Sequence, residues 1–178
     1  MATWVAIPQG MVEEHIRWHN ETAPYGKAGR RVFAMGLPGS GEEFLDWHGD
    51  YFSRYAKWRR QKGLKPIPAW EYLPSRIGKA AGLREGWSPL DLTSYQSVDA
   101  LGIAIESEMH WLVHQGASSH FDDPVLRTSA SPLSPHFWSF LGLILLWREE
   151  WEEHHMVQSQ PAAVLPSEFY LQFWGWMV

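Results

Sequence analysis

The stretch EEHIRWHN, residues 13–20, places His15 and His19 four residues apart. Residues at positions i and i+4 lie on the same face of a helix, with their side chains about 5–6 Å apart. Two imidazoles at this spacing can share one metal ion. Apolar and histidine residues recur at intervals of three and four from residue 11 to 19, so this stretch is expected to be helical and to carry part of a functional site.

Three further histidines lie in two other segments with helical periodicity. His48 belongs to EEFLDWHGDYFSRYAKWRR, residues 42–60, and His110 and His114 repeat the four-residue spacing in ESEMHWLVHQ, residues 106–115. A single histidine on a half-apolar helix face is usually a structural or surface residue. Two spaced pairs and a fifth histidine in one short chain instead predict a metal site or an acid–base site, because imidazole is the commonest metal ligand.

The composition limits the chemistry of such a site. The chain has 178 residues and no cysteine, which favours a single domain over residues 1–178 with a substantial core. Without cysteine there are no disulfides, thiolate zinc sites, iron–sulfur clusters or cysteine nucleophiles. Any metal must therefore be bound by histidine, aspartate or glutamate.

Charge and hydropathy exclude two classes of partner. The net charge is -5, and the one basic cluster, WRRQKGLK at 58–65, is typical of a solvated helix end, so no nucleic acid is expected. The most apolar run, FWSFLGLILLW at 137–147, is shorter than the roughly 20 residues that span a bilayer, so no membrane segment is expected. The N-terminus lacks the pattern of a secretory signal, which favours a cytoplasmic location.

The periodicity predicts an all-α fold. Helices are expected at 11–19, 42–60, 97–115 and 136–155, with a short helix at 74–81. Glycine and proline predict long irregular connections at 20–41 and 63–94. Four main helices with histidines on facing surfaces indicate an antiparallel four-helix bundle with the site in its core. The aromatic end, SEFYLQFWGWMV at 167–178, is expected to cover the body of the protein or to mediate homo-oligomerisation.

Tryptophans and one carboxylate adjoin the histidines. Of the twelve tryptophans, Trp18, Trp47 and Trp111 each precede or follow a candidate histidine, so they form either the wall of a pocket for a small aromatic substrate or ordinary core. Glu106 lies four residues before His110. It could bind the metal, orient an imidazole, act as a base or remain a solvated carboxylate.

The first two histidine segments resemble the central domain of the type 3 copper family, which comprises hemocyanins, arthropod phenoloxidases and tyrosinases. His15 and His19 resemble the HxxxH motif that supplies two ligands of the first metal site, site A. FLDWHGDYFSRY, residues 44–55, resembles the helix that carries the third ligand, His48. A tyrosinase-type alignment would instead leave His15 outside site A.

The later segments resemble the second metal site, site B, of the same family. MHWLVH, residues 109–114, is similar to the HNxxH motif and implies His110 and His114 as site B ligands. SPLSPHFW, residues 131–138, is similar to the DPxFW signature that precedes the last site B histidine, but Leu141 stands where that histidine is expected. Leucine cannot bind a metal. The resemblance implies a four-helix bundle with an intact site A and a degenerate site B.

A non-oxidative reaction follows from this departure, because binding of O₂ as a bridging peroxide requires two well-held coppers. The chain is similar in this respect to the fungal cyclopenases of quinolone alkaloid biosynthesis. That resemblance implies Zn²⁺ at His15, His19 and His48, and ring contraction of the benzodiazepinedione epoxide cyclopenin to the 4-arylquinolinone viridicatin. His110, His114 or Glu106, facing the metal across the bundle, would then move protons. The alternatives are a dicopper phenol oxidase, with His136 or His120 completing site B, and a non-catalytic binding scaffold.

Overall fold

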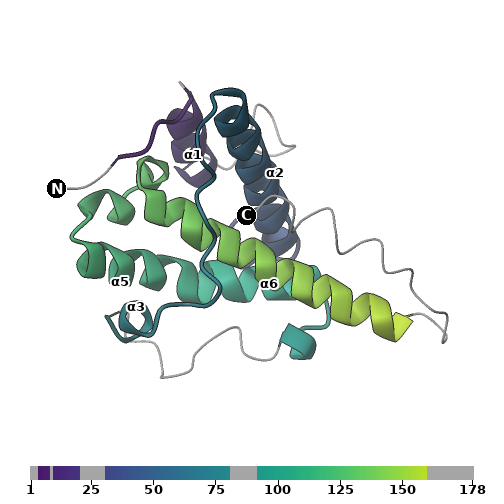
Figure 1. Ribbon diagram of the computed structural model, residues 1–178. Helices are drawn as coiled ribbons and strands as arrows, with labels where there is room; N and C mark the ends of the chain where they lie inside the picture. The colour runs from purple at the N-terminus through teal and green to yellow at the C-terminus, as the bar shows by residue number, and fades with distance from the viewer. Residues whose placement is uncertain (1–3, 9, 21–30, 81–91, 160–178) are drawn as a thin grey trace.

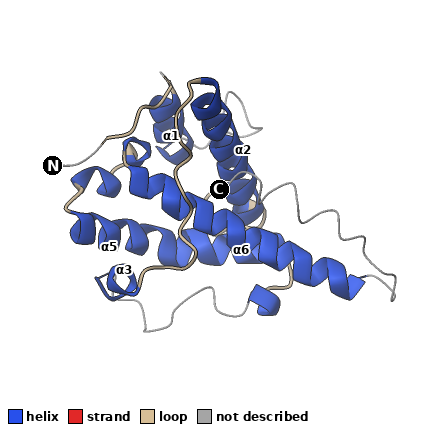
Figure 2. Cartoon of the chain, in the orientation of Figure 1, coloured by secondary structure: helices blue, strands red, loops and turns tan. Residues whose placement is uncertain are grey.

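The computed structural model describes residues 4–8, 10–20, 31–80 and 92–159. Within these ranges the chain is mainly helical, with irregular connections and no strand (Figure 2). The principal helices are α1 (Met11–Asn20), α2 (Ser40–Gln61), α3 (Ser75–Ala80), α4 (Val98–Ala104), α5 (Trp111–Phe121) and α6 (Pro135–Ser159). A π-helical turn, η2 (Ile105–His110), joins α4 to α5, and short 3₁₀ turns lie at η1 (Leu92–Ser94), η3 (Pro124–Arg127) and η4 (Ser131–Leu133).

The prediction of an all-α fold is confirmed, and each helix expected from the periodicity is present. The expected ends differ from the observed ones by six residues at the end of α5 and by four or fewer elsewhere. The hemocyanin-type bundle and the single domain over the whole chain stay predictions. The aromatic end at 167–178, and the parts of the expected connections at 21–30 and 81–91, lie outside the described residues. No described helix is long and apolar enough to cross a membrane.

The other helices pack around the two longest ones, α2 and α6. In Figure 1, α1 lies beside α2, and α6 runs across α2 and the continuous helix formed by α4, η2 and α5. The short helix α3 packs against α5 at the periphery. This arrangement turns one face of α1, α2 and η2 toward the same interior region, which is where the five predicted histidines are found.

Aromatic residues fill the core between α2 and α6. The Trp138 ring stacks on Tyr55 with 3.7 Å between ring centroids, and it also stacks on Tyr51 with 5.3 Å between centroids. Each polar end has a partner: Trp138 Nε1 donates to Pro132 O at 2.8 Å, and the Tyr51 hydroxyl donates to Met11 O at 2.9 Å. Large rings with satisfied polar ends are efficient core residues, so part of the high tryptophan content serves packing.

The contact between α2 and α4 is made by backbone atoms. Gly41 and Gly102 face each other, and a Cβ atom added to either would overlap backbone atoms of the other helix. Just beyond this crossing the Asp99 carboxylate accepts from Gly39 N and Gly41 N, both at 2.9 Å, and from Glu42 N at 3.1 Å. Asp99 therefore caps the first turn of α2 from a different helix, since those amides have no partner within α2.

Candidate metal centre

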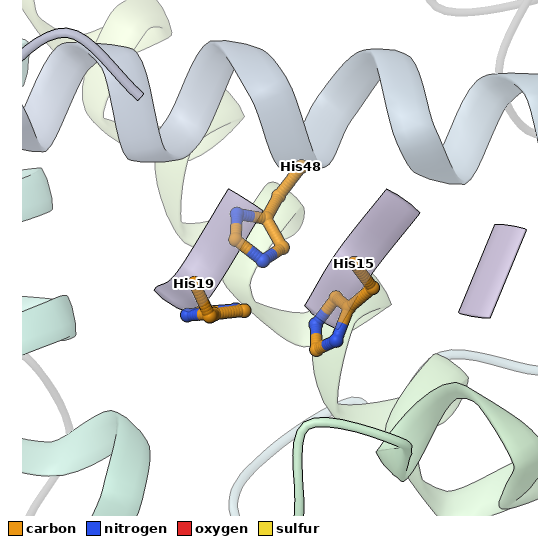
Figure 3. A group of neighbouring side chains, drawn as sticks. All are labelled: His15, His19 and His48. Atoms are coloured by element: carbon orange, nitrogen blue, oxygen red, sulfur yellow. The ribbon is translucent and has the colours of Figure 1, made fainter. Parts of the chain in front are cut away.

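Three histidines from two helices converge in the interior. His15 and His19 project from α1 and His48 projects from α2, and their rings point toward a shared space (Figure 3). Their ligand nitrogens all lie within 4.8 Å of one another. The structure thus brings together the three residues predicted as metal ligands.

Hydrogen bonds fix which nitrogen of the imidazole faces this space. His15 Nδ1 lies 2.7 Å from Ser129 O, and His48 Nδ1 lies 2.8 Å from Phe44 O. A carbonyl oxygen only accepts, so Nδ1 carries the proton in both rings. The unprotonated Nε2 then presents its lone pair, which is the arrangement of a metal-binding histidine held by an outer hydrogen bond.

The three Nε2 atoms have no hydrogen-bond partner among the described residues. Those of His15, His19 and His48 are all buried, although the His19 side chain as a whole is half-buried. A buried polar atom without a partner costs about 1–3 kcal/mol, and most such atoms in proteins are satisfied. A metal ion could satisfy all three nitrogens at once, and three imidazoles with a free fourth position form a known catalytic zinc donor set. The residues therefore fit a metal.

Burial keeps these imidazoles neutral. It lowers the pKa of His15 to about 3, with a smaller opposing effect of the hydrogen bond to Ser129. The pKa values of His19 and His48 also lie well below the usual value, first because of burial and then because of the neighbouring imidazoles. The neutral form is the one that binds metal, so the site is in its ligand form at neutral pH.

The second histidine pair lies next to the first group. The His110 ring is nearly parallel to His19, with 5.9 Å between centroids and 15° between planes. His114 Nδ1 lies 2.8 Å from Leu126 O, and its Nε2 lies 3.2 Å from His110 Nε2. Because the proton of His114 is on Nδ1, its Nε2 accepts and His110 Nε2 donates. Burial lowers the pKa of His114 to about 4, and of His110 well below the usual value.

Among the described residues, no histidine, aspartate or glutamate completes a three-ligand group with His110 and His114. Phenylalanines occupy their surroundings instead. Phe140 lies 5.8 Å from both rings, and Phe137 lies 6.0 Å from His114 and 5.1 Å from His15. Leu141, which the resemblance places at the missing ligand, is buried in α6.

Two of the three predicted tryptophans adjoin the histidine group. Trp18 is fully buried and meets His19 and His48 edge-on, with ring centroids 4.8 and 4.9 Å apart. Trp47 stacks on Trp18 at 4.6 Å and is half-buried. Trp111 does not join them and is 54% exposed, because it lies one position beyond His110 and so points away from the interior face.

Glu106 is buried and is not a member of the three-histidine group. Its Oε1 and Oε2 accept from Arg31 Nη1 and Nη2 at 2.6 and 2.9 Å. Burial raises the pKa of Glu106, and the Arg31 guanidinium offsets part of that rise. The solvated alternative is wrong, since the side chain is 3% exposed. The physical reason is the Arg31 guanidinium, which engages both oxygens of the carboxylate inside the protein.

Sequence reasoning missed Arg31 and the carbonyls of Ser129 and Leu126. Arg31 follows a glycine-rich stretch with no periodicity, and backbone carbonyls carry no sequence signal. Comparisons with protein-family models, curated proteins and solved structures give no match for this chain.

The metal-free protein is expected to lose stability as the pH falls below about 6.5. The unfolded chain takes up protons on its histidines near pH 6.5, whereas folded His15 and His114 resist protonation down to about 3 and 4. Between these limits the unfolded state binds more protons, so the free energy of unfolding decreases with falling pH, by several kcal/mol in total. Urea unfolding of chelator-treated protein at pH 7.5, 6.0 and 5.0 measures this. A midpoint that stays constant over that range would contradict the neutral, buried state of the imidazoles.

Proposed function

We propose that this protein is a zinc-dependent lyase in which His15, His19 and His48 bind the ion. The observation that carries the proposal is the convergence of three buried, unpartnered Nε2 atoms. When bound at such a site, zinc acts as a Lewis acid that polarises a carbonyl or epoxide oxygen. The type 3 copper resemblance, with leucine in place of one ligand, makes the non-oxidative cyclopenase reaction the first one to test.

His110 and His114 supply the acid–base function in this proposal. The Nε2–H of His110 faces the free Nε2 of His114 at 3.2 Å, so the pair already has a donor and an acceptor in line. His114 is held in that tautomer by Leu126 O. The pair can move a proton between the substrate and the interior, a contribution that is typically about 10²–10⁴-fold in rate. Glu106 has no part in this step, because both its oxygens accept from Arg31.

The surroundings suit a small aromatic substrate. Trp18 and Trp47 stack beside the histidines, and Phe137 and Phe140 flank the second pair. Aromatic faces bind aryl groups and stabilise positive charge that develops on them. For cyclopenin, the products viridicatin and methyl isocyanate together contain all the atoms of the substrate, so the ring contraction needs no oxidant.

The nearness of the His110 and His114 Nε2 atoms favours one alternative. At Zn–N or similar bond lengths of about 2.0–2.1 Å, two ligand nitrogens on one tetrahedral ion lie about 3.3 Å apart. The observed 3.2 Å therefore also suits two ligands of a second ion. This geometry keeps a dinuclear copper phenol oxidase as the second candidate.

Metal content and turnover distinguish the candidates. The protein is purified without added metal, and zinc and copper are counted per chain by elemental mass spectrometry. About one zinc, with conversion of cyclopenin to viridicatin that His110→Ala slows and His120→Ala does not, supports the lyase. Two coppers per chain with diphenol oxidation would support the phenol oxidase instead. A metal-free protein without turnover would support the non-catalytic binding scaffold.

A further inference from the structure

A buried ion pair lies between the three-histidine group and the turn that carries the second histidine pair. The Arg31 and Glu106 side chains are 5% and 3% exposed, and they are joined by two parallel hydrogen bonds of 2.6 and 2.9 Å. This two-pronged geometry fixes both the distance and the orientation of the partners, which a single contact would not do. The pair therefore holds the segment before α2 rigidly against the π-helical turn η2.

On one side the pair contacts the aromatic support of the predicted zinc ligands. The Arg31 guanidinium lies over the Trp18 ring, with Cζ 4.7 Å from the ring centroid. The edge of Trp18 in turn contacts His19 and His48. A guanidinium packed on an aromatic face restricts the tilt of that ring. A displacement of Arg31 would therefore be passed to both imidazoles through Trp18.

On the other side of the pair, Glu106 belongs to the same π-helical turn as His110. Glu106 is the second residue of η2 and His110 is its last. π-helical turns are rare and strained relative to the α-helix, so they require outside contacts to persist. The carboxylate of Glu106 supplies one such contact, and the His110 ring at the other end of the turn lies parallel to His19.

Stability alone does not account for this pair. Removing two charges from water costs more than a surface pair regains, and apolar side chains of similar volume often replace a buried ion pair without loss of stability. We propose that Arg31 and Glu106 are positioning residues that fix the separation of His19 and His110, and thereby align the His110–His114 proton relay with the metal centre. This inference rests on the proposed function for the purpose of the alignment, but the alignment itself can be measured without metal.

The test compares three variants of the full chain. Glu106→Gln leaves a buried, unpaired guanidinium, and a lower melting temperature is expected. Arg31→Lys keeps the charge and loses the two-pronged hydrogen bond. The double variant Arg31→Met/Glu106→Met replaces the pair with apolar side chains and is expected to recover the melting temperature. Glu152→Gln, which removes one of the two carboxylate partners of Arg148 in a partly exposed ion pair, is the matched control.

The first measurement uses the metal-free protein. The ¹⁵N chemical shifts of the His110 and His114 ring nitrogens report which nitrogen carries the proton. In the natural chain and in Glu152→Gln we expect His110 to be protonated on Nε2 and His114 on Nδ1. In the double variant, and less completely in Arg31→Lys, we expect His110 shifts that average over both tautomers. Unchanged shifts in a double variant that folds normally would overturn the inference.

The second measurement uses Co²⁺ as a spectroscopic substitute for zinc. We expect the double variant to bind Co²⁺ about 10-fold more weakly, which is the usual effect of losing an outer support, with an altered visible absorption spectrum. A natural chain that binds no Co²⁺ would refute the proposed metal centre, while the tautomer shifts would still decide whether the pair positions His110. Natural affinity and spectrum in the double variant would overturn the positioning role and leave the metal centre intact.

Discussion

Replacement of His48 by alanine is expected to abolish stoichiometric metal binding. His15 and His19 lie on one helix, so His48 is the residue that joins α2 to the site. Without it, two imidazoles at i and i+4 remain, and these form a weak chelate open to water. The affinity should fall by more than the roughly 10- to 100-fold that loss of an outer hydrogen-bond partner causes. Elemental mass spectrometry after gel filtration measures the change.

A histidine outside the site provides the control for this experiment. His120 is exposed at the end of α5, and His120→Ala removes the same group without touching the three-histidine cluster. We expect this variant to retain about one ion per chain. The His48→Ala protein should show an unchanged helical circular dichroism spectrum at neutral pH, so that metal loss is not a consequence of unfolding. Full metal content in a folded His48→Ala variant would place the metal elsewhere.

Replacement of Gly102 by alanine is expected to have the largest effect on stability. The new Cβ would overlap the Gly41 backbone, and neither backbone can move without separating α4 from α2. Overpacking of a core side chain costs about 1–3 kcal/mol, and a backbone collision has no flexible group to yield, so a loss above about 3 kcal/mol is expected. Such a loss is a large part of the 5–15 kcal/mol that stabilises a typical domain.

The separation of α2 from α4 would also disturb the site. The Asp99 cap on the first turn of α2 depends on this close approach, and α2 carries His48. The matched control is Gly49→Ala in α2, where the added Cβ meets Leu145 at an ordinary contact distance of 3.6 Å. There the gain in helix propensity, up to about 1 kcal/mol, should leave stability equal or higher. Equal denaturation midpoints for the two variants would contradict the backbone contact.

The helices and the first metal group could be predicted because both follow from local spacing. The four-residue interval between His15 and His19 sets their common face, and the periodicity around His48 sets a second apolar face that must meet the first. The π-helical turn could not be predicted, since no residue type marks it. The spacing puts Glu106 one turn before His110, whereas in the structure its carboxylate binds Arg31.

The contacts that cross from one element to another were also beyond prediction. Arg31 lies 75 residues from Glu106, and nothing in its surroundings indicates a buried partner. Gly41 and Gly102 are two of 15 glycines, and their close approach depends on the crossing of α2 and α4 in space. Trp111 shares with Trp18 and Trp47 a place next to a histidine, but its direction on the helix exposes it.

The carbonyls of Ser129 and Leu126 determine the proton positions of His15 and His114 through backbone atoms alone. The side chains at 126 and 129 do not take part in these hydrogen bonds. Leu126 is buried in the core, so Ser129, which is half-buried, is the position of the two that can change while the path of the backbone is kept. A homologous protein could thus keep the orientation of the His15 imidazole with a different residue at position 129. A change in the length of this connection would instead move both carbonyls, and so alter the acidity of the two imidazoles while all five histidines remain in the sequence.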